Sequence, residues 1–292
     1  MTGNGKCRVC GGTEWIDNDL CSKCRAVIIA FVSIKGGVGR TNIVIQLAKC
    51  LSAAGKRVLL IDSDLNNSLG YHFLSEEMQE KATSGVNIAT ALSNENNNLC
   101  DYALPVFNAK NIDIIASTPY LADLRTLSEK RLKRMMPTVY EKYDIVIIDC
   151  PPTYDNIVLN AVNAADYTIT PVLKDHFSYN AATYLSRTLP RDVDNFKNWF
   201  VLINGYDKRF EESKFSIQSD YISAYKDQGF ALTPEATWPP WTTQIRHLTD
   251  RNKNLTRTKG IPGTVYNPGL YNAISELANC FFDDALSVPE VF

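Results

Sequence analysis

The chain alternates between short apolar runs and longer stretches in which apolar residues recur every three or four positions. The run "VIIAFVSI" at 27–34 is continuous and rich in β-branched residues, which is typical of a strand buried on both faces. Residues 41–55, "TNIVIQLAKCLSAAG", space their apolar side chains as a helix does, and Gly55 marks the expected helix end. The next apolar run, "KRVLLIDSD" at 56–64, predicts a second strand with acidic residues at its end.

The same alternation continues through the middle of the chain. Further strands are predicted at 112–116, 144–149, 166–172 and 199–204, and helices at 119–136 and 156–164. Strands that alternate with helices form a parallel sheet, so the expected fold class is α/β, doubly wound and mostly parallel, with helices on both faces. The asparagine-rich stretch "SNENNN" at 93–98 is expected to be a surface loop.

Length and charge narrow the picture. The 292 residues allow one large α/β domain with a small appendage, and 45% apolar with 21% charged residues is ordinary for a globular protein. With a net charge of −2, any contact with nucleic acid must come from a local basic patch. We find no apolar run of the roughly 18–20 residues that a membrane span needs, and no signal peptide. The expected location is cytoplasmic.

Four of the eight cysteines lie in the first 25 residues, in the pattern C-x2-C-x10-C-x2-C. Two such C-x2-C turns aim four thiolates at one point and suit a tetrahedral structural Zn²⁺ site, whose metal would supply the folding energy of so short a segment. A rubredoxin-like iron site uses the same ligands, and incidental cysteines in a tail are the remaining alternative. We therefore expect a zinc-binding module at 1–26 and one large α/β domain at 27–292. The ligands are Cys7, Cys10, Cys21 and Cys24.

A glycine-rich segment, "SIKGGVGRTN" at 33–42, follows the first predicted strand and opens the first predicted helix. Backbone N–H groups at such a helix start hold phosphates, although glycines in this place can also serve a tight turn alone. Carboxyl ends of parallel strands share one edge of the sheet, so Asp62, Asp64 and Asp149 are expected to converge beside this loop. The Thr41 hydroxyl would then ligate Mg²⁺, with Asp149 nearby as a Walker B carboxylate.

Three motifs together resemble the ParA/MinD family of deviant Walker A ATPases, and among them the ParA-like (Soj-like) partition ATPases. They are "KGGVGRT" at 35–41, "VLLIDSDLNNS" at 58–68 and "YDIVIIDCPPT" at 143–153, in the family's order and spacing. The resemblance covers nearly all of the chain after the cysteine module. It implies an ATP- and Mg²⁺-dependent homodimer in which two nucleotides are sandwiched between the subunits, with ATPase activity.

The resemblance also implies roles for individual residues. Lys35 matches the signature lysine that reaches the partner subunit's ATP. Asp64 matches the acid that positions the attacking water, and Asp62 matches the acid that supports the network of Mg²⁺ and water. Asp149 matches Walker B. Asn204, in "INGYD", matches an adenine contact, although a simple turn residue is the alternative there, as a helix N-cap is for Asp64. The remaining nucleotide-binding positions implied are Gly36, Gly37, Val38, Gly39, Arg40, Thr41, Asn42 and Pro239.

The chain departs from the family pattern at several positions. Arg40 stands where the family has lysine, Ile34 replaces the first glycine, and Asn42 replaces a second Thr or Ser. Arginine keeps the charge but is bulkier and planar, so the exchange is not conservative at a tight site. We expect nucleotide binding to persist and hydrolysis to be slow. The alternative is a nucleotide-gated regulatory protein with little or no hydrolysis that acts through a protein partner.

Whether the protein binds a membrane or DNA has to be inferred from the C-terminal part of the chain. The C-terminal stretch "LYNAISELANCFFDDALSVPEVF" has no basic face, which argues against a membrane anchor of MinD type. The segment 244–260, "QIRHLTDRNKNLTRTKG", is basic, and we expect non-specific, salt-sensitive DNA binding there. The alternative is that these side chains only form a solvated surface. Its basic residues are Arg246, Arg251, Lys253, Arg257 and Lys259.

ParA-type behaviour further implies nucleoid association, partition or positioning of a plasmid, chromosome or protein cargo, and a stimulating partner of ParB or adaptor type. An iron–sulfur carrier ATPase is a less favoured class, because such carriers need a C-terminal C-P-x-C pair and this chain has only Cys280 in that region.

Overall fold

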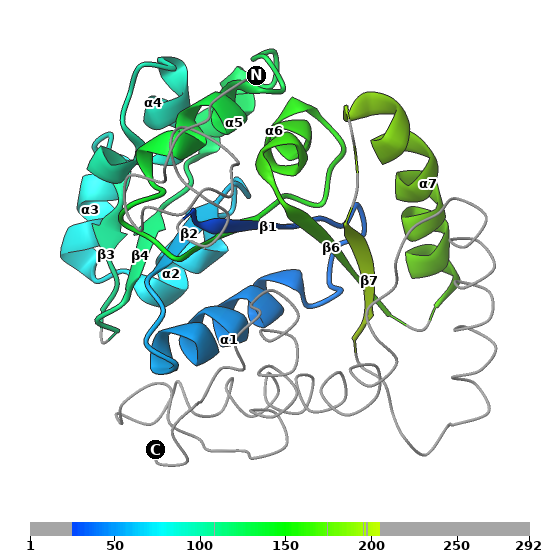
Figure 1. Cartoon of the computed structure of the whole chain (residues 1–292), viewed down its shortest axis with the longest axis horizontal. Coiled ribbons are helices and arrows are strands. Elements are labelled where there is room, and N and C mark those ends of the chain that lie inside the picture. The colour runs from blue at the N-terminus through cyan, green and yellow to red at the C-terminus, as the bar shows by residue number, and fades with distance from the viewer. Residues whose placement is uncertain (1–24, 108, 174, 195, 197, 205–292) are drawn as a thin grey trace, which may run out of the picture.

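The computed structural model describes residues 25–107, 109–173, 175–194, 196 and 198–204. These residues form a seven-stranded sheet in the order β3-β4-β2-β5-β1-β6-β7, with helices on both of its faces (Figure 1). Strand β3 pairs antiparallel with β4, and the other neighbours in the sheet are parallel. The α/β, doubly wound, mostly parallel fold expected from the sequence is confirmed.

The strands are β1 Val27–Phe31, β2 Val58–Asp62, β3 Leu104–Pro105, β4 Ile112–Ile115, β5 Ile145–Asp149, β6 Tyr167–Val172 and β7 Trp199–Ile203. The α-helices are α1 Arg40–Ala53, α2 Ser68–Phe73, α3 Glu76–Thr83, α4 Ile88–Ser93, α5 Arg131–Met135, α6 Asn156–Ala164 and α7 His176–Asp192. Short 3₁₀ turns are η1 Leu99–Tyr102, η2 Pro119–Leu124 and η3 Met136–Thr138.

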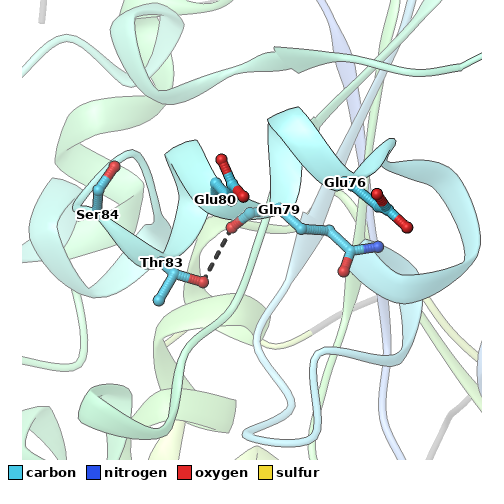
Figure 2. Close-up of a pocket in the computed structure, with 5 residues that line it drawn as sticks. All are labelled: Glu76, Gln79, Glu80, Thr83 and Ser84. Atoms are coloured by element: carbon cyan, nitrogen blue, oxygen red, sulfur yellow. Dashed lines mark hydrogen bonds between the residues drawn. The ribbon is translucent and has the colours of Figure 1, made fainter.

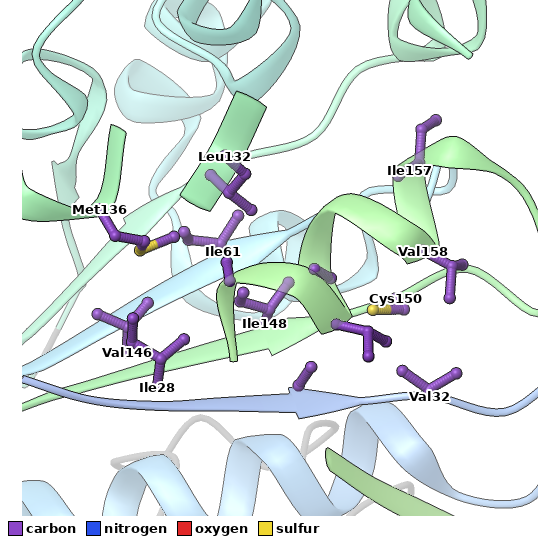
Figure 3. Packing of buried hydrophobic residues seen from close by; sticks show 14 of the residues in the cluster. Ile28, Val32, Ile61, Leu132, Met136, Val146, Ile148, Cys150, Ile157 and Val158 are labelled. Carbon is purple, nitrogen blue, oxygen red and sulfur yellow. The ribbon is translucent and has the colours of Figure 1, made fainter. Parts of the chain in front are cut away.

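The sheet separates two hydrophobic cores, because successive residues of each strand point to opposite faces. In β2, Leu59 and Ile61 belong to one core, which is completed by α4, α5, α6 and α7, while Leu60 belongs to the other, which is completed by α1, α2 and Ala82 of α3. Figure 3 shows part of the first core, where α6 lies over the central strands. Burial on both faces explains why these strands read as continuous apolar runs.

The region between the second strand and the fourth was only partly predicted. It contains α2, α3, α4 and the two-residue strand β3, none of which the apolar pattern had indicated. The residues at 94–98 do form a largely exposed loop, and the helix predicted at 156–164 is confirmed as α6.

The single helix predicted for 119–136 is wrong. That stretch forms η2, a turn and the short helix α5. Two asparagines of α6 bind its backbone: the Asn160 side chain accepts from Leu132 N at 2.9 Å and donates to Ser128 O at 3.0 Å, and Asn156 donates to Leu127 O at 3.1 Å. These side-chain bonds satisfy backbone groups at the start of α5 and in the turn before it, and so take the place of the hydrogen bonds of a continuous helix.

Two further features bear on the sequence analysis. Cys50 and Cys150 are buried, whereas Cys100 is half-buried. Burial raises the pKa of the Cys150 thiol to about 12. Among the helices of the described residues, we find none whose length and apolar character would let it cross a membrane.

Candidate nucleotide-binding site

The loop between β1 and α1 (the P-loop, residues 32–39) takes its shape from glycine. Gly37 and Gly39 have φ angles of +76° and +86°, in the left-handed region that other residues rarely adopt. Gly39 directly precedes α1, whose first turn carries no acidic residue. Gly36 and Gly37 are exposed, so this part of the loop, which leads into the start of α1, is open to an anion.

Asn204, at the end of β7, closes one side of the P-loop. Its Nδ2 donates to Val38 O at 2.7 Å, and a Cβ added at Gly39 would lie 2.3 Å from that nitrogen. The side chain is buried. The family resemblance implies that Asn204 contacts the adenine base, whereas the bond to Val38 O fixes the conformation of the loop. The role toward adenine stays a prediction.

Asp62 and Asp149 lie side by side at the carboxyl edge of the sheet, because they are paired residues of β2 and β5. Both are fully buried. Asp62 accepts from Asp64 N at 3.0 Å and from Leu69 N at 2.9 Å. Burial, together with the neighbouring charge of Asp149, raises the pKa of Asp62 to about 8.

Thr41 and Arg40, at the start of α1, share the Asp149 carboxylate. Thr41 Oγ1 donates to Asp149 Oδ2 at 2.6 Å, and Arg40 Nε donates to Asp149 Oδ1 at 2.7 Å. Burial raises the pKa of Asp149, and the bonds from Arg40 and Thr41 oppose this rise. The expected convergence of the P-loop, the helix start and the three acids is therefore what the structure shows.

Asp64 is held from both sides. Its Oδ1 accepts from Asn66 N at 3.0 Å and Asn66 Nδ2 at 2.9 Å, and its Oδ2 accepts from Arg40 NH2 at 3.3 Å. Helix α2 begins only at Ser68, with Asn67 as its N-cap residue, so Asp64 is not a helix N-cap. Its side chain is 12% exposed, which leaves it accessible at the edge of the site.

Lys35 points away from these acids. Its Nζ forms an ion pair with Asp175 Oδ2 and donates to Ser178 Oγ at 3.1 Å. Asp175 is the N-cap of α7, where its Oδ1 accepts from Ser178 N at 2.8 Å. Burial acts to raise the pKa of Asp175, but its bonds to Lys35 and Ser178 outweigh this and hold the pKa below its usual value.

Sequence reasoning missed Asn66, Asp175 and Ser178. A signal for the last two was present, since "DHFS" at 175–178 follows a predicted strand and places an acid three residues before a serine, as a helix N-cap does. The remaining assigned residues lie outside the described part of the chain. They are the cysteines of the zinc module, Pro239, Cys280 and the basic residues of 244–260.

The donor set at this edge fits Mg²⁺. The Thr41 hydroxyl and the buried carboxyl groups of Asp62 and Asp149 are hard oxygen ligands of the kind that Mg²⁺ prefers. Among the described residues, no group of three or more His, Cys, Asp or Glu side chains is arranged as a protein-only metal site. This agrees with Mg²⁺ sites in which water and phosphate complete the coordination.

A separate surface hollow lies along α3 and is lined by Glu76, Gln79, Glu80, Thr83 and Ser84 (Figure 2). Its acidic lining is unsuited to phosphate, and no P-loop residue contributes to it.

Comparison with known proteins places the chain in a family. A family model described as "AAA domain" matches residues 26–200. The sporulation initiation inhibitor protein Soj of Bacillus subtilis is 34% identical over 195 residues, which are 61% of this chain and 70% of Soj.

Similar solved structures point to the same family. A plasmid partition protein from Borrelia burgdorferi is 31% identical, with a TM-score of 0.58 over 67% of this chain and 87% of that protein. A putative plasmid partition protein from the same organism, bound to AMPPNP, is 26% identical, with a TM-score of 0.63 over 87% of this chain and 98% of that protein. Together with the P-loop and the carboxylates beside it, these matches show that the chain belongs to the ParA/MinD-like family of P-loop ATPases, among the relatives of Soj.

Proposed function

We propose that this protein is a ParA-like partition ATPase that binds ATP with Mg²⁺, dimerises in that state and binds DNA without sequence preference. The observation that carries the proposal is the shared Asp149 carboxylate. It joins the start of α1 to the sheet edge through Thr41, with Asp62 and Asp64 beside it. A phosphate chain on the P-loop would lie next to these oxygens. The AMPPNP bound to the Borrelia relative supports ATP as the nucleotide.

Each residue of the site would have a role that follows from its position. Backbone N–H groups of Gly36 to Gly39 and the start of α1 would hold the phosphates, and Thr41 and Asp149 would hold Mg²⁺, with Asp62 in support. Mg²⁺, when bound, neutralises charge on the phosphates. Asp64 is fixed by Asn66 and partly exposed, so it can accept a hydrogen bond from the attacking water. Lys35 would leave Asp175 and neutralise charge on the partner subunit's nucleotide.

Residues outside the described part of the chain also have roles, which follow from the sequence alone. Residues 1–26 would form a zinc-binding module, and 27–292 the ATPase domain. The basic residues of 244–260 would contact DNA phosphates in the ATP-bound dimer, and a partner of ParB or adaptor type would stimulate hydrolysis. The Soj and plasmid-partition relatives support a role in moving or positioning a plasmid, chromosome or protein cargo at the nucleoid.

The test is binding to random-sequence duplex DNA, followed by fluorescence anisotropy with ATP, with ADP and without nucleotide. Tight, salt-sensitive binding only with ATP supports the proposal. The variant Arg251→Glu should weaken that binding several-fold. Lys133→Glu is the matched control, since it makes the same charge change on the exposed face of α5. Equal binding in all three nucleotide states, or none in any, would overturn the ATP-gated DNA contact.

One observation favours a second candidate, a nucleotide-gated binding protein with little hydrolysis. Arg40, which stands in the place of the family's phosphate-binding lysine, directs its guanidinium at Asp149 and Asp64. Multiple-turnover phosphate release in the presence of DNA distinguishes the two candidates. A rate indistinguishable from that of the Asp64→Ala variant would favour the binding protein.

A further inference from the structure

Arg40 is a buried cation that contacts oxygen atoms of its own chain. Its side chain is 7% exposed. Within the described residues, its three hydrogen bonds go to Asp149 Oδ1 at 2.7 Å, to Asp64 Oδ2 at 3.3 Å and to Ser33 O at 3.3 Å. The guanidinium thus lies where two acids at the ends of different strands approach each other.

The two oxygens of Asp149 are both engaged in this arrangement. Oδ1 accepts from Arg40 and Oδ2 accepts from Thr41, and the carboxylate itself has no exposed surface. A divalent cation that approaches Asp149 would therefore meet a positive charge already in contact with the carboxylate. Two cations on one buried carboxylate repel each other strongly in a medium of low dielectric constant, so each weakens the binding of the other.

Arginine suits this position better than the lysine it replaces. The planar guanidinium offers donors in a fixed fork, and here Nε and NH2 reach carboxylates of two different residues at once. A lysine ammonium is a single point charge on a flexible stem and has no such fork to bind two carboxylates in a fixed geometry. Burial acts to lower the pKa of Arg40, but the charge of Asp149 and the hydrogen bond to it raise the pKa by more, so the guanidinium stays fully charged.

We propose that Arg40 is a built-in counter-cation that occupies the carboxylates of Asp149 and Asp64 in the nucleotide-free protein and competes with the divalent cation for Asp149. The metal binds there only when the guanidinium has rotated away, toward the phosphates of an incoming nucleotide. Metal and nucleotide are thereby coupled through one side chain. The inference rests on the proposed function only in its placing of Mg²⁺ beside Thr41 and Asp149.

The experiment uses Mn²⁺ alone as the probe, with the full-length, nucleotide-free protein. Bound and free Mn²⁺ are separated by electron paramagnetic resonance. The wild-type protein should bind Mn²⁺ weakly, and Arg40→Met should bind it at least tenfold more tightly. Lys35→Met is the matched control, since it removes the other cation of the same loop, which pairs with Asp175 instead; its Mn²⁺ affinity should equal that of wild type.

A second variant locates the gained site. Adding Asp149→Asn to Arg40→Met should abolish the gain in Mn²⁺ affinity. If Arg40→Met does not fold, Arg40→Lys serves in its place, because lysine has one charged nitrogen for two carboxylates and should bind Mn²⁺ severalfold more tightly than wild type. Equal Mn²⁺ affinity in the wild type and the Arg40 variants, or a gain that survives Asp149→Asn, would overturn the proposal. Neither result depends on nucleotide or DNA, so failure here is distinct from failure of the partition function.

Discussion

Replacing Gly39 with alanine should be the most costly single-methyl change in the P-loop. Two independent effects combine at this position. The φ angle of +86° strains any residue with a Cβ by about 1–2 kcal/mol. The new Cβ would also lie 2.3 Å from Asn204 Nδ2 and displace the buried bond to Val38 O, a loss of about 1–3 kcal/mol. The expected fall in the free energy of unfolding is therefore about 2–5 kcal/mol, the sum of these two effects.

The loop supplies its own controls. Gly37→Ala has a φ of +76° but no atom within 4 Å of the new Cβ, so it should show the backbone strain alone, about 1–2 kcal/mol. Gly36→Ala has neither a positive φ nor a neighbour within 4 Å and should be close to neutral. Urea unfolding of the nucleotide-free protein, followed by tryptophan fluorescence and far-UV circular dichroism, measures all three.

A double-mutant cycle separates strain from collision. Asn204→Ala removes the group that the new methyl would strike, so Gly39→Ala combined with Asn204→Ala should be less destabilising than the sum of the two single changes by at least about 1 kcal/mol. Strict additivity would refute the collision. A cost for Gly37→Ala equal to that of Gly39→Ala would refute the claim that Asn204 shapes the loop.

Three other predictions address function and stability. Asp64→Ala should abolish ATP turnover, measured by phosphate release, yet preserve the ATP-dependent dimer in gel filtration, because the proposed role of Asp64 is to position the attacking water and not to bind the phosphates; unchanged turnover would contradict its assignment. Metal analysis should find one Zn²⁺ per chain, and a variant with both Cys7→Ser and Cys10→Ser should contain none; a red, iron-containing protein would instead indicate the rubredoxin-like site. Burial acts to raise the pKa of Asp144, but the hydrogen bonds and charge of Arg57 outweigh it and hold the pKa below its usual value. The pair's contribution is therefore present above the unfolded pKa of about 3.9 and disappears as pH falls through the lower folded value. Asp144→Asn should cost under about 1 kcal/mol at pH 7, as expected for a partly exposed pair, and nothing near pH 2 in acid unfolding; a constant difference at every pH would contradict the assignment.

Six of the seven strands in the described residues were predictable, because they are largely buried on both faces and read as apolar runs; the two-residue strand β3 was not. The site was predictable in outline for a related reason. Parallel strands deliver their carboxyl ends to one edge, so Asp62 and Asp149, 87 positions apart in sequence, become paired residues of adjacent strands.

What the sequence did not give is the direction in which long polar side chains point. Asn160 and Asn156 face the backbone of 127–132 and prevent the helix expected there, and no periodicity reveals such a contact. Arg40 was expected to meet phosphate on the strength of its place in the motif, yet its guanidinium turns to carboxylates that approach only once the sheet has formed. Tertiary partners of this kind override local expectation.

Lys35 of the P-loop and Arg40 at the start of α1 are thus both neutralised within the chain, but by partners of different kinds. Arg40 is buried against Asp149 at the sheet edge, whereas Lys35 pairs with Asp175, a partly exposed residue at the start of α7. A nucleotide brings at least three negative charges to the loop, so its phosphates compete with carboxylates for each cation. The exposed pair is weak and separates readily in water, while the buried one leaves an uncompensated carboxylate unless another cation arrives. Release of Lys35 can therefore follow from the nucleotide's charge alone, but release of Arg40 needs the metal as well, which would make this loop respond to the nucleotide and its divalent cation as one ligand.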